Sequence, residues 1–187
     1  AAYHPDVTPP VGLLRFVTPF GHAGVNAYAI ITEHHALVFD TGTDASPIIA
    51  KLTDQDITPD TLYITHRHHD HIAGVPDFGK SGIVYPEDAH PGEIRKMANE
   101  HQLSILDASG HANPARAYLY KGLDVPVCIL GDSIFAGSMG GAADPQRYQQ
   151  ALQTARENLM PLPPQTSFLD GIQSLRVINS LRVFLAS

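Results

Sequence analysis

The sequence predicts one α/β domain that spans residues 1–187. Short apolar runs of strand length alternate with segments of helical composition, which is typical of this fold class. The length suits one domain with a substantial core, and the hydrophobic content of 43% is normal for a globular protein. No linker-like stretch or internal repeat divides the chain. We therefore expect the strands and helices to pack around a common core.

The order of the elements follows from the apolar runs and the residues that interrupt them. Strands are expected over residues 13–17, 25–32, 36–39, 62–64, 82–85, 103–106 and 125–130, and helices over 46–52, 91–101 and 145–159. Ser46 followed by Pro47 is typical of a helix start, with Ser46 as the N-cap. In residues 167–187 the apolar residues fit one face of a helix, while the β-branched ones also suit strands.

Charge and cysteine content disfavour several classes of protein. The formal net charge is −7, from 12 basic and 19 acidic residues, which argues against a nucleic-acid partner held by phosphate contacts. No apolar run approaches the roughly 20 residues that cross a membrane. With Cys128 as the one cysteine, an intrachain disulfide is impossible, and a cytoplasmic location fits this. Because Cys128 lies within an expected strand, we interpret it as a core residue.

A dense group of metal-binding side chains follows the strand expected at residues 62–64. Four histidines and an aspartate occur within six positions, and a histidine-rich surface turn would have no need for so many donors of one kind. In an extended segment His66 and His68 point to the same face, so both can bind one ion. Asp70 and His71 follow where the chain must turn, and they can face a second ion.

Three further polar residues stand at the ends of expected strands. His111 follows the strand at 103–106, although a lone histidine is more often structural or exposed. Asp132 follows a strongly apolar strand, where a carboxylate needs a cation or several hydrogen bonds. Asp40 ends the strand at 36–39 and is either a turn former or a support for a polar group nearby.

The His-x-His-x-Asp-His pattern of residues 66–71 resembles the signature of the metallo-β-lactamase superfamily. The Asp-Thr-Gly at 40–42, the Gly-His at 110–111 and the Gly-Asp-Ser-Ile-Phe at 131–135 resemble further motifs of that superfamily. This resemblance implies an αββα sandwich, in which two mixed β-sheets are flanked by helices.

The resemblance also implies a site for two metal ions. It assigns the first ion to His66, His68 and His111, and the second to Asp70, His71 and Asp132. Asp132 would bridge the ions, Asp70 would orient the nucleophile, and Asp40 would support the ligands from behind. Zinc is expected, and iron or manganese would suit the same donors.

The resemblance fails near the C-terminus. Single-domain members of the superfamily carry a Pro-Gly-His-Gly whose histidine completes the second metal site, but no histidine follows His111 here. Residues 167–187 therefore depart from the family pattern, and Gly141 stands where a related loop usually has arginine. The second site is either weakened or empty, or another residue or a water fills the position, or this segment is altered relative to its relatives.

The expected activity is that of a metal-dependent hydrolase. A metal ion with an open coordination position lowers the pKa of its bound water to about 7, and the resulting hydroxide attacks an activated carbonyl. Resemblance to the glyoxalase II type favours a thioester, with a lactone or a β-lactam as alternatives. A mono-iron oxygenase of sulfur compounds and a non-catalytic metal-binding protein also remain open. The expected partner is a small-molecule substrate, and the sequence leaves the oligomeric state undetermined.

Overall fold

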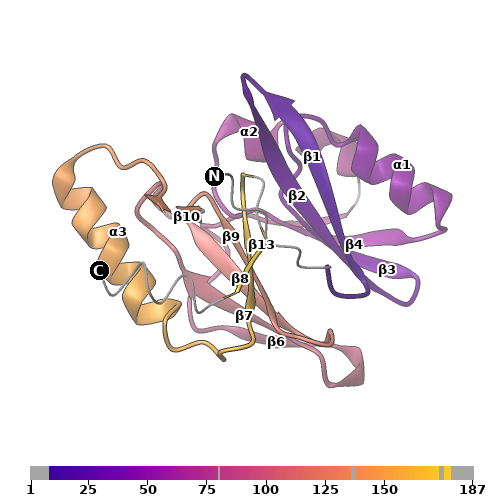
Figure 1. Ribbon diagram of the computed structural model, residues 1–187. Helices are drawn as coiled ribbons and strands as arrows, with labels where there is room; N and C mark the ends of the chain where they lie inside the picture. Colours follow the sequence, from indigo (N-terminus) through magenta and orange to yellow (C-terminus); the bar gives the residue numbers. More distant parts are fainter. Residues whose placement is uncertain (1–8, 80, 136–137, 173–174, 178–187) are drawn as a thin grey trace.

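Two β-sheets lie face to face, and helices cover their outer surfaces (Figure 1). The structure is a computed structural model that describes residues 9–79, 81–135, 138–172 and 175–177. On one side α1 covers the first sheet, and on the other α3 covers the second. The αββα sandwich expected from the sequence is therefore confirmed. In the described part of the chain, no helix has both the length and the apolar character needed to cross a membrane.

The first sheet is mixed and has the strand order β1-β2-β3-β4-β5. Its strands are β1 (Leu13–Phe20), β2 (Ala23–Thr32), β3 (His35–Phe39), β4 (Thr58–Tyr63) and β5 (Gly82–Val84). The first three strands run antiparallel to one another, whereas β3, β4 and β5 are parallel. A parallel pair needs a crossover, and α1 (Ser46–Asp54) provides it between β3 and β4.

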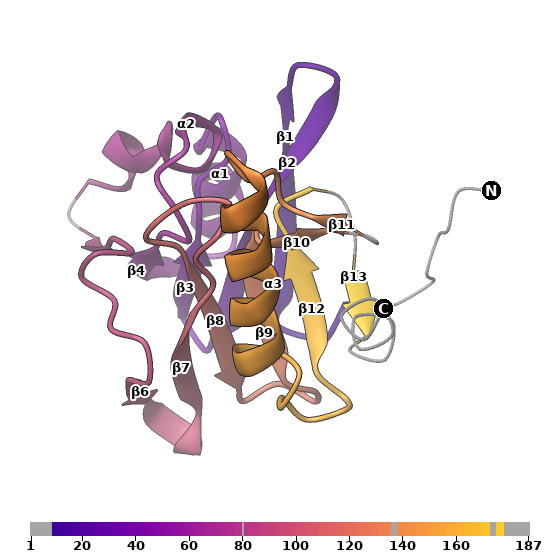
Figure 2. The same cartoon turned by 90° about the vertical axis from the view of Figure 1, so that its left-hand side faces the viewer.

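The second sheet has the strand order β13-β12-β9-β8-β7-β6. Its strands are β6 (Ile94–Lys96), β7 (Gln102–Asp107), β8 (Arg116–Lys121), β9 (Val127–Gly131), β12 (Ser167–Asp170) and β13 (Leu175–Val177). Among the strands that the structure describes in this sheet, only β9 and β12 pair in parallel, and α3 (Pro145–Asn158) is the crossover between them (Figure 2). A small hairpin of β10 (Ile134–Phe135) and β11 (Ser138–Met139) follows β9.

Three layers of buried apolar side chains hold the sandwich together. The middle layer lies between the sheets and includes Phe39 and Tyr63 from the first sheet and Tyr118 from the second. The rings of these three residues are in mutual contact, with centroids 5.2 to 5.6 Å apart. The outer layers pack α1 and α3 onto the sheets, as Ile48 and Leu52 show with their i, i+4 spacing on α1.

The segment at 91–101 is not the helix that the sequence predicted. Residues Ile94–Lys96 form the edge strand β6, and a short 3₁₀ turn (Ala98–Glu100) leads into β7. Pairing with β7 satisfies the backbone groups of residues 94–96 in place of helical hydrogen bonds. Tertiary pairing therefore overrides the helical spacing of the apolar residues. The strand β8 at 116–121 was missed altogether.

One other prediction needs a smaller correction. Ser46 is the first residue of α1 instead of its N-cap, and the carboxylate of Asp44 accepts hydrogen bonds from both the amide and the hydroxyl of Ser46. In the tail, where the sequence suited either a helix or strands, residues 167–170 form a strand. The prediction for 178–187 lies outside the described residues.

Candidate metal centre

The site lies on the rim where β3, β4, β9 and β12 end. Asp40 follows β3, Thr65 and His66 follow β4, and Asp132 follows β9. The fourth strand, β12, ends at Asp170 beside Gly131. This is the edge at which parallel strands deliver their loops, so residues far apart in the sequence come together there.

Three imidazoles converge on one point of this rim. Nε2 of His66 lies 3.0 Å from Nδ1 of His68, and Nε2 of His111 lies 3.0 Å from the same Nδ1. Bonds of 2.0–2.1 Å to a tetrahedral ion would space ligand nitrogens by about 3.4 Å, close to these separations. The three nitrogens therefore have the arrangement of ligands around a common cation.

Hydrogen bonds on the far side of two rings direct lone pairs toward this point. Nδ1 of His111 is 2.8 Å from the carbonyl oxygen of Gly141, which can only accept, so Nδ1 carries the proton and Nε2 the lone pair. Nδ1 of His66 is 3.1 Å from the hydroxyl of Thr65. His66 is buried, whereas His68 is exposed, so the point of convergence is open on the side of His68.

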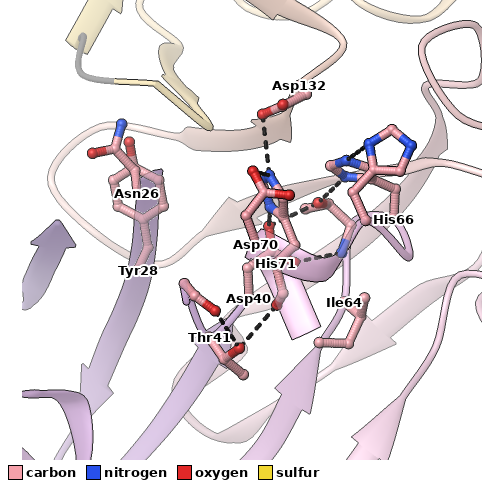
Figure 3. A network of polar contacts seen from close by, with 12 residues as sticks. Asn26, Tyr28, Asp40, Thr41, Ile64, His66, Asp70, His71 and Asp132 are labelled. Atoms are coloured by element: carbon pink, nitrogen blue, oxygen red, sulfur yellow. Dashed lines mark hydrogen bonds and ion pairs between the residues drawn. The ribbon is translucent and has the colours of Figure 1, made fainter. Parts of the chain in front are cut away.

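A second group of donors adjoins the first (Figure 3). Nε2 of His71 lies 3.3 Å from Oδ1 of Asp132 and 3.8 Å from Oδ2 of Asp70. Asp132 also reaches the first group, since its Oδ2 is 3.8 Å from Nε2 of His111. One carboxylate thus stands between the two groups, where a bridging ligand would have to be. Asp70 and His71 come from the short helix α2 (His69–Ile72), whose carbonyl at His71 accepts from the amide of Thr41.

Asp40 lies behind both groups and binds their supports. Its Oδ1 accepts from the amide of Thr65, and its Oδ2 accepts from the hydroxyl of Thr65 and from Nδ1 of His71, at 2.7–2.8 Å. The backbone of Asp40 is left-handed (φ 59°), a conformation that costs an L-residue about 1–2 kcal/mol. The strained backbone turns the carboxylate inward, where it fixes His71 with Nε2 toward Asp132.

Burial and nearby charges shift the pKa values of the neighbouring rings of His66 and His71 in opposite directions. Burial, together with the charge of His71, lowers the pKa of His66 to about 2, so its lone pair stays available. Burial alone would lower the pKa of His71, but the carboxylates of Asp40 and Asp132 outweigh it and raise that pKa to about 10. Burial would likewise raise the pKa of Asp132, but His71 outweighs it and lowers it.

The donor set fits a divalent metal ion. Nε2 of His71 and Oδ1 of Asp132 are buried and make no well-formed hydrogen bond to any described residue. Buried polar atoms without partners are rare, and a cation between these two would satisfy both. Imidazole and carboxylate together suit zinc, iron and manganese.

A separate cavity lies away from this rim and lacks its chemistry. It has a volume of about 320 Å³ and lies where β3 and β4 begin, with His35 and His101 in its lining. His35 pairs with Asp60 at 2.9 Å in an exposed position. In the described residues, the only groups of three donors that could hold an ion lie on the rim with His66.

Comparison with known proteins bears on this geometry. A family profile described as the metallo-beta-lactamase superfamily matches residues 21–144, which is more than half of the chain. The chain belongs to the metallo-β-lactamase superfamily. The resemblance of its motifs is therefore confirmed, and residues 40–42, 66–71, 110–111 and 131–135 all fall within the matched segment.

Curated relatives of this superfamily member carry hydrolase names. A "Hydroxyacylglutathione hydrolase" from Aliivibrio fischeri is 34% identical over 121 residues, covering 58% of this chain and 46% of that protein. The chain thus spans about half the length of the first such relatives that it matches. A Bacillus subtilis protein named "Probable metallo-hydrolase YqgX" is 25% identical over 186 residues, covering 82% of this chain and 87% of that protein.

Two solved structures have the same fold as this chain. The BLEG-1 B3 metallo-beta-lactamase superposes with a TM-score of 0.77 at 21% identity, over 93% of this chain and 100% of that one. TTHA1623, solved in a di-iron-bound form, gives a TM-score of 0.69 at 19% identity, over 89% of this chain and 96% of that one. At such identities the likeness shows the fold alone.

The rim brings together every residue that the sequence singled out as a ligand: His66, His68, Asp70, His71, His111 and Asp132. Their roles as ligands stay a prediction. Sequence reasoning missed Thr65 and the carbonyl of Gly141, which support the rings from behind. It also missed Gly171, where an added methyl group would overlap Oδ1 of Asp132. Nothing in a sequence distinguishes a glycine beside a site from a glycine in a turn.

Proposed function

We propose that this protein is a metal-dependent hydrolase that cleaves an activated carbonyl compound. The observation that carries the proposal is the convergence of three imidazole nitrogens on a point open to solvent beside His68. Three protein ligands with an open position are the arrangement of catalytic zinc, whereas closed structural sites have four. When bound, the ion supplies an acidified water at neutral pH and polarises a carbonyl oxygen.

The protein's own groups have separate tasks in this scheme. His66, His68 and His111 would hold the ion, and the carboxylate of Asp132 beside them would offset part of its positive charge. Asp70 is partly exposed and lies within 3.8 Å of His71, so its carboxylate can accept a hydrogen bond from the attacking water and orient it. Asp40 and Thr65 keep the ligand rings in place from behind, which reduces the reorganisation needed during reaction.

We propose a thioester as the substrate class. The relatives named hydroxyacylglutathione hydrolase support this choice, although this chain matches only part of their length. A lactone or β-lactam is the alternative, since both are activated carbonyls that the same centre would attack. Zinc is our first choice of metal, and the buried thiol of Cys128 accords with a cytoplasmic location.

The test is hydrolysis by purified protein loaded with zinc, iron or manganese. A glutathione thioester should be hydrolysed, and the His68→Ala variant should lose both the ion and at least 100-fold in activity, because two imidazoles do not hold the ion. His69→Ala is the matched control, since His69 is exposed and belongs to neither donor group. Absence of activity on thioesters, lactones and β-lactams with all three metals would refute the proposal, as would an active His68→Ala variant.

A further inference from the structure

The short helix α2 presents Asp70 and His71, but it contains little that would hold it in place. It has four residues, and no described side chain caps its N-terminus. Such a short helix is not stable by itself, because its few hydrogen bonds do not offset the cost of nucleation. Contacts with the rest of the protein must therefore set the direction of the two donors.

Two consecutive residues of the loop after β3 hold His71, one at its ring and the other at its backbone (Figure 3). Nδ1 of the ring donates to the carboxylate of Asp40 at 2.8 Å. The carbonyl oxygen of His71 accepts from the amide of Thr41 at 2.9 Å, and the hydroxyl of Thr41 lies 3.0 Å from the same oxygen. Held in this way, the ring places Nε2 at 3.3 Å from Oδ1 of Asp132.

The hydroxyl of Thr41 also fixes the chain that leaves α2. Its oxygen accepts from the amide of Gly74 at 3.0 Å, and its one proton serves the carbonyls of His71 and Gly42, which lie 3.0 and 2.9 Å away. A methyl group on Cα of Gly74 would overlap Ala45, which precedes α1, so this segment is closely packed on its other side. Thr41 is fully buried. Its hydroxyl therefore joins α2 to the segment that follows the helix.

The first donor group has supports of its own. The ring of His111 is bound by the carbonyl of Gly141, and the ring of His66 lies beside the hydroxyl of Thr65. The hydrogen bonds of the Thr41 side chain go to residues 42, 71 and 74, which lie outside the first group. The two donor groups are thus supported by different hydroxyls.

Building on the proposed function, we infer that Thr41 is a positioning residue for the second donor group. Its hydroxyl holds α2 so that Asp70 and His71 face Asp132 and can bind a second ion with it. Thr41 supplies no ligand atom. Because its contacts are made to α2 and its surroundings, loss of the hydroxyl weakens the second position and leaves the first as it is.

Zinc titration in competition with a chromophoric chelator tests the inference without reliance on activity. Wild-type protein should show two binding events, and Asp70→Ala identifies the event that belongs to the second group. Thr41→Val removes the hydroxyl and should weaken that event by about 10- to 100-fold, the usual effect of losing a residue that orients a ligand. The other event should be unchanged. Thr41→Ser keeps the hydroxyl and should restore the weakened event.

Thr166→Val is the matched control. Thr166 is also fully buried, and its hydroxyl has no hydrogen-bond partner among the described residues. It precedes β12, at the end of that strand away from the rim. The same chemical change at this position should leave both binding events unchanged. Thr41→Ala, which adds no bulk, replaces Thr41→Val if the valine variant does not fold.

The outcomes separate this inference from the proposed function. Unchanged zinc binding in Thr41→Val, equal weakening of both events, or failure of Thr41→Ser to restore binding would overturn the inference and leave the hydrolase proposal intact. A single event in the wild type would do the same, since the second group would then hold no ion. If the wild type bound no zinc, iron or manganese at micromolar concentration, both proposals would fail.

Discussion

At the scale of single residues, the centre contains two adjacent imidazoles whose pKa values are shifted in opposite directions. The ring centroids of His66 and His71 are 4.2 Å apart. His66 is buried beside a hydroxyl, whereas His71 is enclosed by the carboxylates of Asp40 and Asp132. Loss of solvation therefore decides the direction of the pKa shift of His66, and the negative charge of the two carboxylates decides that of His71.

The two rings should therefore titrate far apart in the metal-free protein. With a pKa lowered to about 2, His66 should remain neutral at pH 5, where an ordinary histidine is charged. With a pKa raised to about 10, His71 should still be charged at pH 8, where an ordinary histidine is neutral. Nitrogen-15 NMR of the histidine side chains reports both states. In urea both rings should return to ordinary titration, and ordinary titration in the folded protein would contradict the prediction.

Donor residues could be predicted from the sequence, but the residues that orient them could not. A dense pattern is formed by His66, His68, Asp70 and His71, and its metal-binding chemistry can be recognised without knowledge of the fold. Gly141 holds His111 through its backbone carbonyl, a group that every residue has. Side-chain identity carries no information about such a contact.

At the scale of elements, the position of His111 is tied to the packing of α3. Gly110 precedes His111 and has φ of 154°, and a methyl group there would overlap Cβ of Ala151 on α3. The loop that carries the third imidazole is thus pressed against the helix with no space between them.

Gly110→Ala should move either the loop or the helix. We expect a loss of about 1–3 kcal/mol in the free energy of unfolding, because overpacking costs that much, and at least tenfold weaker zinc binding. Gly92→Ala is the matched control, since Gly92 also has positive φ (88°) but nothing within 4 Å of an added methyl group. It should lose stability through backbone strain alone and bind zinc normally. Thermal unfolding and calorimetry measure both effects, and equal zinc affinity in the two variants would contradict the coupling.

Elements with strong periodicity were predictable, and short edge strands were not. Residues 145–159 show a helical stripe, and α3 (Pro145–Asn158) is indeed a helix. On β6 the apolar Ile94 is 57% exposed while Arg95 is half-buried, so apolar residues do not mark the inner face of this strand in the sequence. The pairing with β7 decides the conformation of β6, and the local sequence around β6 gives no sign of that contact.

At the scale of the whole molecule, the centre joins the two sheets. His66 follows β4 of the first sheet, whereas His111 and Asp132 are presented by the second. Main-chain bonds already link the sheets nearby, since the amide of Arg116 donates to the carbonyl of Thr65 at 2.8 Å. An ion bound by all three histidines adds a connection that exists only when the sheets are docked.

Removal of metal should therefore lower the stability of the whole domain. Free zinc at 1,000 times its Kd would stabilise the folded state by about 4 kcal/mol. We expect EDTA to lower the Tm by several degrees, and zinc to restore it. In His68→Ala neither treatment should shift the Tm. An unchanged Tm in the wild type would show that the ion does not join the sheets.

The sandwich as a whole could be predicted because the motifs at 40–42, 66–71, 110–111 and 131–135 resemble those of a superfamily, and that resemblance implies the fold. The expectation of one domain over residues 1–187 stays a prediction. The lack of a histidine after His111 could be read in the sequence, but the closeness of Gly171 to Asp132 required the structure.

Every donor lies beyond the last paired residue of its strand, so the rim can change while the layers persist. A substitution at one donor should therefore alter metal binding and leave the pairing of the strands as it is.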